Sequence, residues 1–389
     1  MIDVEMQGLL RLVRNALCDE AEPISEQCDI ETVVELAGKH QVEMLAYDGA
    51  KRCGYDKNHP AIRALFAKCC KAAVKSDLQM TELQKLYAAF DEAHVDYMPL
   101  KGCIMKAMYP GPEFRAMNDA DILIRPEQYE KTTKVIMERL GYNFLAESDC
   151  ELKWCKKGLY AELHKRLIPS FIKDFYGYFG DGWSLAEKQS GTRYAMSREN
   201  EFLFIFTHFA RHYREGGVGI RHMTDLWLYR RNNPQMQEEI ILAALKTLSL
   251  ETFYVNILMT LKNWFEGGEE TETTALMTDY IKNSGSFGNQ ENRHTAQSLR
   301  KTKGKGTWGA VLHTIFPSVN NMQYAYPVLK KWPVLLPVMW VYRWCKVLFG
   351  HREKLRKQKF VFRKTDVKKM DAFEQNMRAV GLSMEFKGE

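Results

Sequence analysis

A pair of aspartates at the start of a short apolar run constrains this chain more than any other feature of its sequence. Asp119 and Asp121 are separated by one residue and lead directly into Ile122, Leu123 and Ile124. Side chains at positions i and i+2 of a strand project from the same face, so we expect the two carboxylates about 6–7 Å apart on one side of a sheet. Carboxylates bind hard cations such as Mg2+, and paired ions support in-line displacement at phosphorus. The sequence therefore predicts a divalent-cation site at a strand.

The surrounding sequence predicts a small mixed sheet with helices around it. The apolar pattern changes from helical to strand-like after His94. Pro126 is placed to open a helix that Gly141 stops. The expected strands are 95–100, 119–124, 142–145, 152–156 and 160–163, and the expected helices between them are 102–108 and 126–140.

Helical patterns dominate on both sides of this core, so we predict an α+β fold. Residues 1–92 are interpreted as an N-terminal helical region, residues 93–168 as the core with the small mixed sheet, and residues 169–389 as a C-terminal helical region. The polar segment 266–306 is rich in Gly, Ser, Thr, Asn and charged residues, and is expected to be a mobile loop or a partly disordered insertion. With 389 residues, of which 46% are hydrophobic, the chain can bury more than one core.

Motifs on either side of the aspartates carry a family resemblance. The chain has L-K-G at 100–102, a Pro- and Gly-containing loop with Arg115, D-A-D at 119–121 and E-L-H at 162–164. In this order the motifs resemble the DNA polymerase beta-like nucleotidyltransferase superfamily, and more closely its family of uncharacterised nucleotidyltransferases. The motif core covers about residues 98–167, and a weaker similarity in apolar pattern extends over most of the chain. The wider superfamily usually has Gly-Ser or Gly-Gly upstream of the acids, whereas this chain has Lys101, Gly102 and Cys103.

The resemblance implies metal-dependent transfer of a nucleoside monophosphate from an NTP to an acceptor, with release of pyrophosphate. Asp119, Asp121 and Glu162 would hold two Mg2+ or Mn2+ ions, and Glu162 would coordinate or accept the acceptor's proton. Lys101 and Arg115 would contact phosphates. The alternatives are a solvated strand entrance for the aspartates, a surface ion pair for Glu162, a solvated strand end for Lys101, and a salt bridge from Arg115 to Glu113 or an aspartate.

Residues close to these motifs, or on a later predicted helix, have functional interpretations, and some of them have structural ones as well. The helix that begins at Gly102 could present backbone N–H groups to a phosphate. His164 would orient the adjacent glutamate or touch a base, or it is a core histidine. By similarity to the family, His208, Arg221 and Asp225 would line the nucleotide or acceptor cleft. Alternatively, Arg221 and Asp225 form an i, i+4 ion pair on one helix.

Two other patterns in the sequence have simpler interpretations. His208 and His212 have a spacing that can bind zinc, but no third ligand is evident and no glutamate follows the first histidine, so zinc is not favoured. The C-terminal segment mixes aromatic and basic residues, which is typical of a surface that meets an anionic membrane or a polyanion. We favour a helix that packs its aromatic face on the helical region and exposes its basic face. The residues concerned are Trp332, Trp340, Trp344, Phe349, Arg343, Lys346, Arg352, Lys354, Arg356, Lys357 and Lys359.

The net charge and the cysteine pattern say little about which partners the chain binds. The formal net charge of +6 favours anionic ligands but is common in proteins that bind none. The nine cysteines show no C-x-x-C pairing, and the N-terminus lacks a basic segment followed by an apolar one, so we expect a reduced, cytoplasmic location.

The leading hypothesis is a nucleotidyltransferase that uses an NTP and an acceptor that the sequence does not identify: a small molecule, a sugar, a protein side chain or a tRNA end. Its rivals are a nucleotide-binding or interaction protein whose catalysis has lapsed, and a tRNA-modifying toxin. A membrane surface is a partner that we do not favour.

Overall fold

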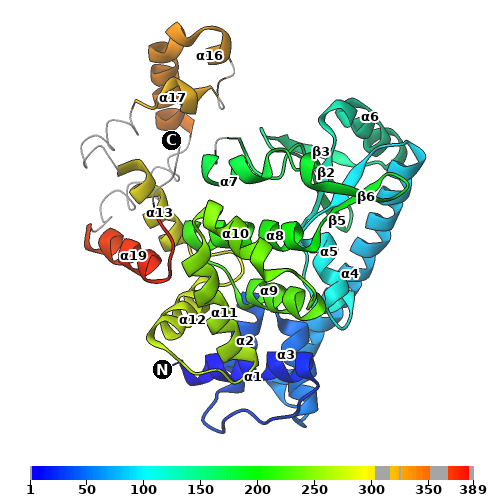
Figure 1. The fold of residues 1–389 in the computed structure, drawn as a ribbon, viewed down its shortest axis with the longest axis vertical. Coiled ribbons are helices and arrows are strands. Elements are labelled where there is room, and N and C mark those ends of the chain that lie inside the picture. The colour runs from blue at the N-terminus through cyan, green and yellow to red at the C-terminus, as the bar shows by residue number, and fades with distance from the viewer. Residues whose placement is uncertain are drawn as a thin grey trace.

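The computed structural model describes residues 2–170, 172–302, 316–323, 326, 328–350 and 367–384, and it contains a seven-stranded mixed sheet (Figure 1). The strand order is β3-β4-β5-β2-β1-β7-β6. The strands are β1 Tyr97–Pro99, β2 Ala120–Ile124, β3 Asn143–Glu147, β4 Glu151–Lys156, β5 Leu159–His164, β6 Ala186–Ser190 and β7 Arg193–Met196. The sheet is mixed because β2 pairs in parallel with β5 but antiparallel with β1. Together with the flanking helices, it confirms the predicted α+β class.

Helices precede, interrupt and follow the sheet. Those before it are α1 Val4–Cys18, α2 Ile30–His40, α3 Glu43–Arg52 and α4 Pro60–Glu92. Those between strands are α5 Gly102–Met105, α6 Tyr129–Lys134, α7 Lys173–Phe179, short 3-10 helices at Lys106–Met108, Pro112–Phe114, Pro126–Gln128 and Trp183–Leu185, and a π-helix at Val135–Leu140. Those after it are α8 Arg198–Glu215, α9 Ile220–Asn232, α10 Glu238–Leu248, α11 Glu251–Phe265, α12 Glu272–Ser284, α13 Gln290–Thr302, α15 Val319–Met322, α16 Val328–Lys331, a 3-10 helix at Pro333–Leu335, α17 Leu336–Gly350 and α19 Val367–Ala379.

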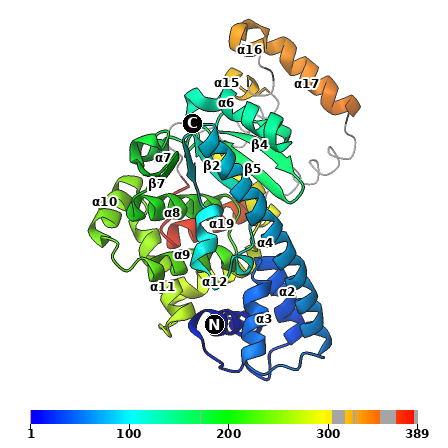
Figure 2. The ribbon, with the colours of Figure 1, turned by 90° about the vertical axis from the view of Figure 1, so that its right-hand side faces the viewer.

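The two faces of the sheet carry different layers, and β2 alternates between them. Ile122 belongs to a core that includes Phe90 of α4, the helix that runs along one face (Figure 2). Leu123 belongs to the larger core, which includes Phe204 of α8. Because successive side chains of a strand point to opposite faces, Asp121 projects to the same side as Leu123. The strand therefore directs this carboxylate into the space between the sheet and the C-terminal helices.

The predicted loop over 266–306 is wrong for most of its length. Residues 272–284 and 290–302 form α12 and α13, while 303–306 lie outside the described residues. Thr271 caps α12 by accepting a hydrogen bond from the backbone N–H of Thr274, and Met277 and Ile281 are buried on one side. A narrow apolar stripe is enough to bury a polar helix, and average composition conceals it. The hairpin β6–β7 also lies in a region that we expected to be helical.

The predicted packing of the C-terminal aromatic helix is wrong as well. Trp332, which was expected on the packed aromatic face, is 61% exposed, and Val334, Val338, Val341 and Tyr342 are 78%, 61%, 53% and 51% exposed. The aromatic contacts of α17 are instead local, since the rings of Phe316 and Trp340 lie 5.1 Å apart. The predicted basic positions 352–359 lie outside the described residues. Within the described ranges, no helix combines the length and apolar character needed to cross a membrane.

Candidate active site

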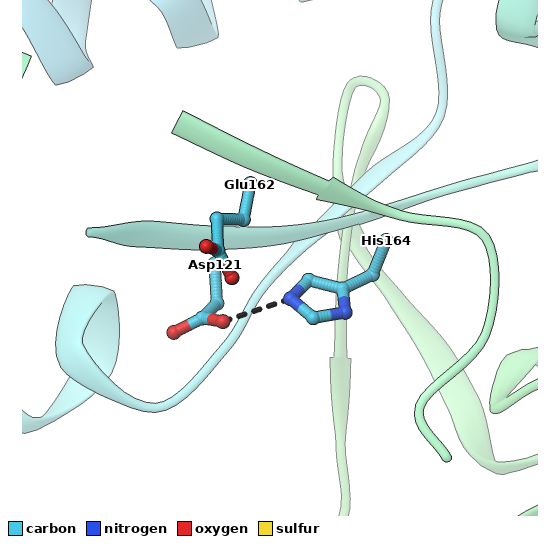
Figure 3. A group of neighbouring side chains, drawn as sticks. All are labelled: Asp121, Glu162 and His164. Atoms are coloured by element: carbon cyan, nitrogen blue, oxygen red, sulfur yellow. Dashed lines mark hydrogen bonds and ion pairs between the residues drawn. The ribbon is translucent and has the colours of Figure 1, made fainter. Parts of the chain in front are cut away.

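The aspartate strand and the E-L-H strand are neighbours in the sheet. β2 and β5 run in parallel with Asp121 opposite Glu162, so both side chains lie on one face, and His164 follows two residues later on that face. Figure 3 shows the three side chains pointing toward one another. One potential ligand atom from each lies within 4.8 Å of the other two. The structure thus brings together three residues that are separated by up to 43 positions in the sequence.

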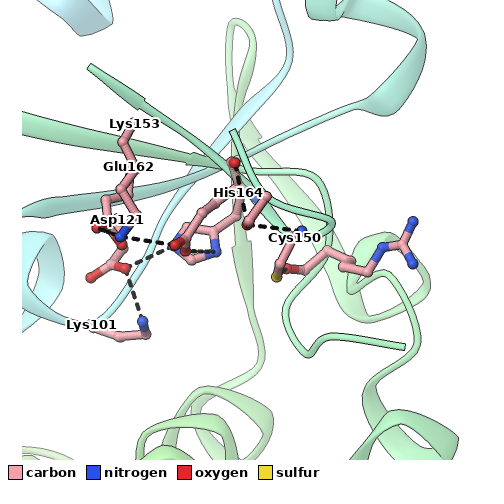
Figure 4. Close-up of polar contacts among 9 residues, drawn as sticks. Lys101, Asp121, Cys150, Lys153, Glu162 and His164 are labelled. Atoms are coloured by element: carbon pink, nitrogen blue, oxygen red, sulfur yellow. Dashed lines mark hydrogen bonds and ion pairs between the residues drawn. The ribbon is translucent and has the colours of Figure 1, made fainter. Parts of the chain in front are cut away.

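Asp121 is the most strongly held member of this group. Its Oδ1 atom lies 2.8 Å from Lys101 Nζ and 2.8 Å from His164 Nε2 (Figure 4). Burial by itself raises the pKa of this carboxyl, but the Lys101 ammonium and His164 outweigh it and hold the pKa well below its usual range. Burial opposes a charge on His164, yet the contact with Asp121 raises the pKa of the imidazole to about 9. His164 therefore orients a carboxylate, but that of Asp121 rather than that of Glu162.

Glu162 and Asp119 differ from Asp121 in that their pKa values are raised. Burial raises the pKa of Glu162 although it forms an ion pair with Lys153, and the neighbouring carboxylates add to the increase. Burial and the charge of Asp121 likewise raise the pKa of Asp119. Asp119 lines the same cavity without belonging to the compact group of three. Carboxylates with raised pKa values gain stability from an added cation.

The L-K-G motif forms part of the cavity lining. Lys101 has a positive φ of 42°, which is unusual for a residue with a side chain, and its Nζ atom reaches Asp121. Gly102 allows a close approach, because a Cβ atom there would lie 2.6 Å from Arg115 Nη1. Strained backbone of this kind persists where the surrounding structure fixes it, often at functional sites. Gly102 also lines the cavity, but its visible role is to make room for Arg115.

Arg115 takes the structural interpretation, a salt bridge to an aspartate. Its Nε and Nη2 atoms donate to the two oxygens of Asp225 over 3.2 and 2.9 Å, and the hydroxyl of Tyr109 donates to Asp225 Oδ1 over 2.8 Å. Both charged side chains are buried. Arg115 thus ties the motif loop to α9; it also lines the cavity, and the phosphate contact predicted for it stays a prediction.

Arg221 is a buried cation, and the nearby carboxylate of Asp225 is already bonded to Arg115 and Tyr109. It is 8% exposed, and its Nη1 atom donates to the carbonyl oxygen of Ala116 over 3.1 Å. Its Nε atom has no hydrogen-bond partner among the described residues. Burial and the nearby Arg115 guanidinium lower the pKa of Arg221 to about 10. The alternative of an i, i+4 pair with Asp225 is therefore not what α9 forms.

These groups surround one cavity of about 470 Å3 between the sheet and helices α8 and α9. The acidic wall comes from β2 and β5, and the opposite wall includes His208, His212 and Arg221. Burial lowers the pKa of His208 well below its usual value and that of His212 to about 3, so both imidazoles are neutral. Their rings lie 4.3 Å apart, and across the described residues the cluster able to hold a metal ion is the one on β2 and β5.

The sequence interpretation missed Lys153 and Glu151. Both lie on β4, where Lys153 pairs in register with Glu162 and its Nζ atom lies 2.9 Å from a carboxylate oxygen of Glu151. The alternation in E-L-K-W at 151–154, polar on one face and apolar on the other, could have placed both charges beside the E-L-H strand.

The fold gathers carboxylates from adjacent strands at one cavity, and the comparison with known families gives the class of the protein. Residues 26–266 match the family of uncharacterised nucleotidyltransferases, so the chain belongs to this family. No curated protein matches the chain. Among solved structures, it is similar to the antibiotic-resistance factor ANT(2'')-Ia, with 16% identity over 44% of this chain and 93% of that one, and a TM-score of 0.34.

Proposed function

We propose that this nucleotidyltransferase moves a nucleoside monophosphate from an NTP to an acceptor hydroxyl, with release of pyrophosphate and with help from divalent cations. The observation that carries the proposal is the convergence of Asp121 and Glu162, from adjacent parallel strands, with Asp119 in the same cavity. The cavity volume of about 470 Å3 is within the range of small-molecule sites.

The donor set fits a divalent cation. Two carboxylates and one imidazole converge within 4.8 Å, and the carboxylates of Asp121 and Glu162 already attract the ammonium groups of Lys101 and Lys153. Oxygen-rich sets suit Mg2+, and an imidazole is compatible with Mn2+. When bound, such ions neutralise triphosphate charge and lower the pKa of the attacking hydroxyl. Asp119, Asp121 and Glu162 would hold them, with His164 orienting Asp121.

The remaining side chains would position the triphosphate. Lys101 lies beside the acids and would turn from Asp121 to a phosphate oxygen once other cations neutralise that carboxylate. Arg221 has an N–H without a partner among the described residues, and this donor would bind the leaving pyrophosphate. Arg221 would therefore share the phosphate role that the sequence assigned to Arg115. His208 lies in the opposite wall, and its neutral imidazole suits hydrogen bonding to a base or an acceptor.

The test is a label-transfer screen with the full chain. Each α-labelled NTP is incubated with Mg2+ or Mn2+ and a cell extract as the source of acceptors. The proposal predicts a labelled product that needs the metal and falls to background with Asp121→Asn, while Glu147→Gln, a change at a half-exposed residue of β3, keeps the activity.

Two results would contradict the proposal. Metal-dependent NTP binding without any transfer would identify a nucleotide-binding protein whose catalysis has lapsed. Transfer that survives Asp121→Asn would place the chemistry elsewhere. A label found only on tRNA would keep the reaction and identify the toxin-type acceptor.

A further inference from the structure

The most exposed apolar surface of the described C-terminal region lies on and just before α17. Val334, Val338, Val341 and Tyr342 are all more than half exposed. From Val338 onward they are spaced by three and four residues, so they share one face of the helix. We call these four residues the valine face. Exposed aliphatic groups gathered on one helical face indicate a binding surface, because single scattered ones would need no explanation.

The opposite side of α17 is occupied by its own neighbours. The rings of Trp340 and Trp344 each lie 5.1 Å from the ring of Phe316, and Trp340 Nε1 donates to the carbonyl oxygen of Pro317 over 2.9 Å. Tyr342, which belongs to the valine face, also meets the ring of Tyr326 over 5.9 Å and remains half exposed. These contacts fix which face of the helix points outward, so the exposure of the valines is a property of a folded unit.

The excess of lysine and arginine in the surrounding sequence favours an anionic partner for the valine face. Residues 292–352 contain ten Lys and Arg and no Asp or Glu, whereas the whole chain has a formal charge of +6, so the remainder carries −4. Lys331, which is exposed, lies directly before the valine face. Along the sequence, positive charge therefore flanks the segment that carries the valine face, and an anionic partner would complement it.

We infer that the valine face binds the surface of an anionic lipid bilayer. Valines insert at the boundary between headgroups and acyl chains, tyrosine and tryptophan suit the headgroup level, and lysine and arginine attract anionic lipids. A nucleic acid would use the cations but gains little from aliphatic side chains. A second copy of the chain is less suited, since four side chains offer roughly 400 Å2 against the roughly 800 Å2 per partner of a stable interface.

The orientation expected for α17 is parallel to the membrane plane. Its 15 residues measure about 22 Å at the usual helical rise, less than the ~30 Å of a hydrocarbon core. Binding in the plane leaves the cavity between β2 and α8 open, because that cavity is lined by residues of 101–225 and not by α17. The inference is thus independent of the proposed reaction.

Vesicle co-sedimentation of the full chain tests the inference. We expect the chain to bind vesicles of phosphatidylcholine with phosphatidylglycerol at least about tenfold more tightly than vesicles of phosphatidylcholine alone. The double variant Val338→Ser, Val341→Ser should bind the anionic vesicles about tenfold more weakly. The matched control, Val74→Ser with Val255→Ser, changes two valines that are 62% and 49% exposed on α4 and α11 and should bind like the wild type.

Several results would overturn the inference. One is equal binding of the double variant and the wild type to anionic vesicles, and another is no preference for anionic lipid. A dimer that dissociates on the valine changes would identify a second copy as the occupant. Salt-sensitive tRNA binding in the absence of vesicle binding would identify a polyanion. Circular dichroism of the variants excludes misfolding as the cause of lost binding.

Discussion

Removing the charge of Asp225 should destabilise the fold far more than removing that of a comparable exposed aspartate. Asp225 is 4% exposed and accepts hydrogen bonds from Arg115 and Tyr109. In Asp225→Asn the Arg115 guanidinium stays buried without a counter-charge, close to the Arg221 guanidinium, whose pKa it already lowers. Loss of one partner from a buried pair costs about 3–5 kcal/mol, so we expect a decrease of that size in the free energy of unfolding.

The assay is guanidinium denaturation followed by tryptophan fluorescence, with Asp96→Asn as the control. Asp96 pairs with Arg125 over 2.7 Å, but their side chains are 23% and 30% exposed, and such pairs contribute about 0–1 kcal/mol. Replacing both Arg115 and Asp225 with leucine should cost less than the sum of the single changes, because no charge is left unpaired. If Asp225→Asn costs no more than Asp96→Asn, the structural role given to Arg115 is wrong.

Two further predictions concern the helical scaffold. Gly49→Ala should lower the free energy of unfolding by about 2–3 kcal/mol in the same denaturation assay, because a Cβ atom there would lie 2.0 Å from the carbonyl oxygen of Leu12. The control is Gly177→Ala, which has open space around it and should be neutral or slightly stabilising. His40 accepts a hydrogen bond from the Ile220 backbone N–H, and burial lowers its pKa from 6.5 to about 4. The unfolded state therefore binds the proton first as the pH falls, and about 3 kcal/mol of stability is lost between pH 6.5 and 4. Denaturation at several pH values should show this loss in the wild type and not in His40→Gln, and equal slopes would contradict it.

The strands that carry the site could be predicted because their signals are local. The sequence D-A-D-I-L-I places Asp121 and Ile122 on opposite faces of a strand whatever the rest of the chain does. The two hydrophobic cores reproduce this alternation, because Ile122 lies in one and Leu123 in the other. The E-L-H strand has the same pattern, with Leu163 in the core under α4 and Glu162 on the face of the cavity. Period-two alternation of this kind fixes the face of every residue once the strand is recognised.

The partners of the charged residues could not be predicted, because they come from distant parts of the chain. Arg115 and Asp225 are 110 residues apart, and no spacing rule links a loop to a helix beyond the sheet. β7 pairs with β1 through Arg193 and Tyr97, a contact that only the folded sheet defines. β6 is also largely exposed, so its apolar pattern gives no strand signal.

The most direct test of the central claim is Mn2+ binding in the presence of an NTP, followed by electron paramagnetic resonance, since it does not depend on knowing the acceptor. The wild-type chain should bind the ion together with the NTP, and Asp121→Asn and Glu162→Gln should each weaken binding at least about tenfold. Glu147→Gln, on the exposed strand β3, should bind as the wild type does. Undiminished Mn2+ binding by Asp121→Asn would contradict the account.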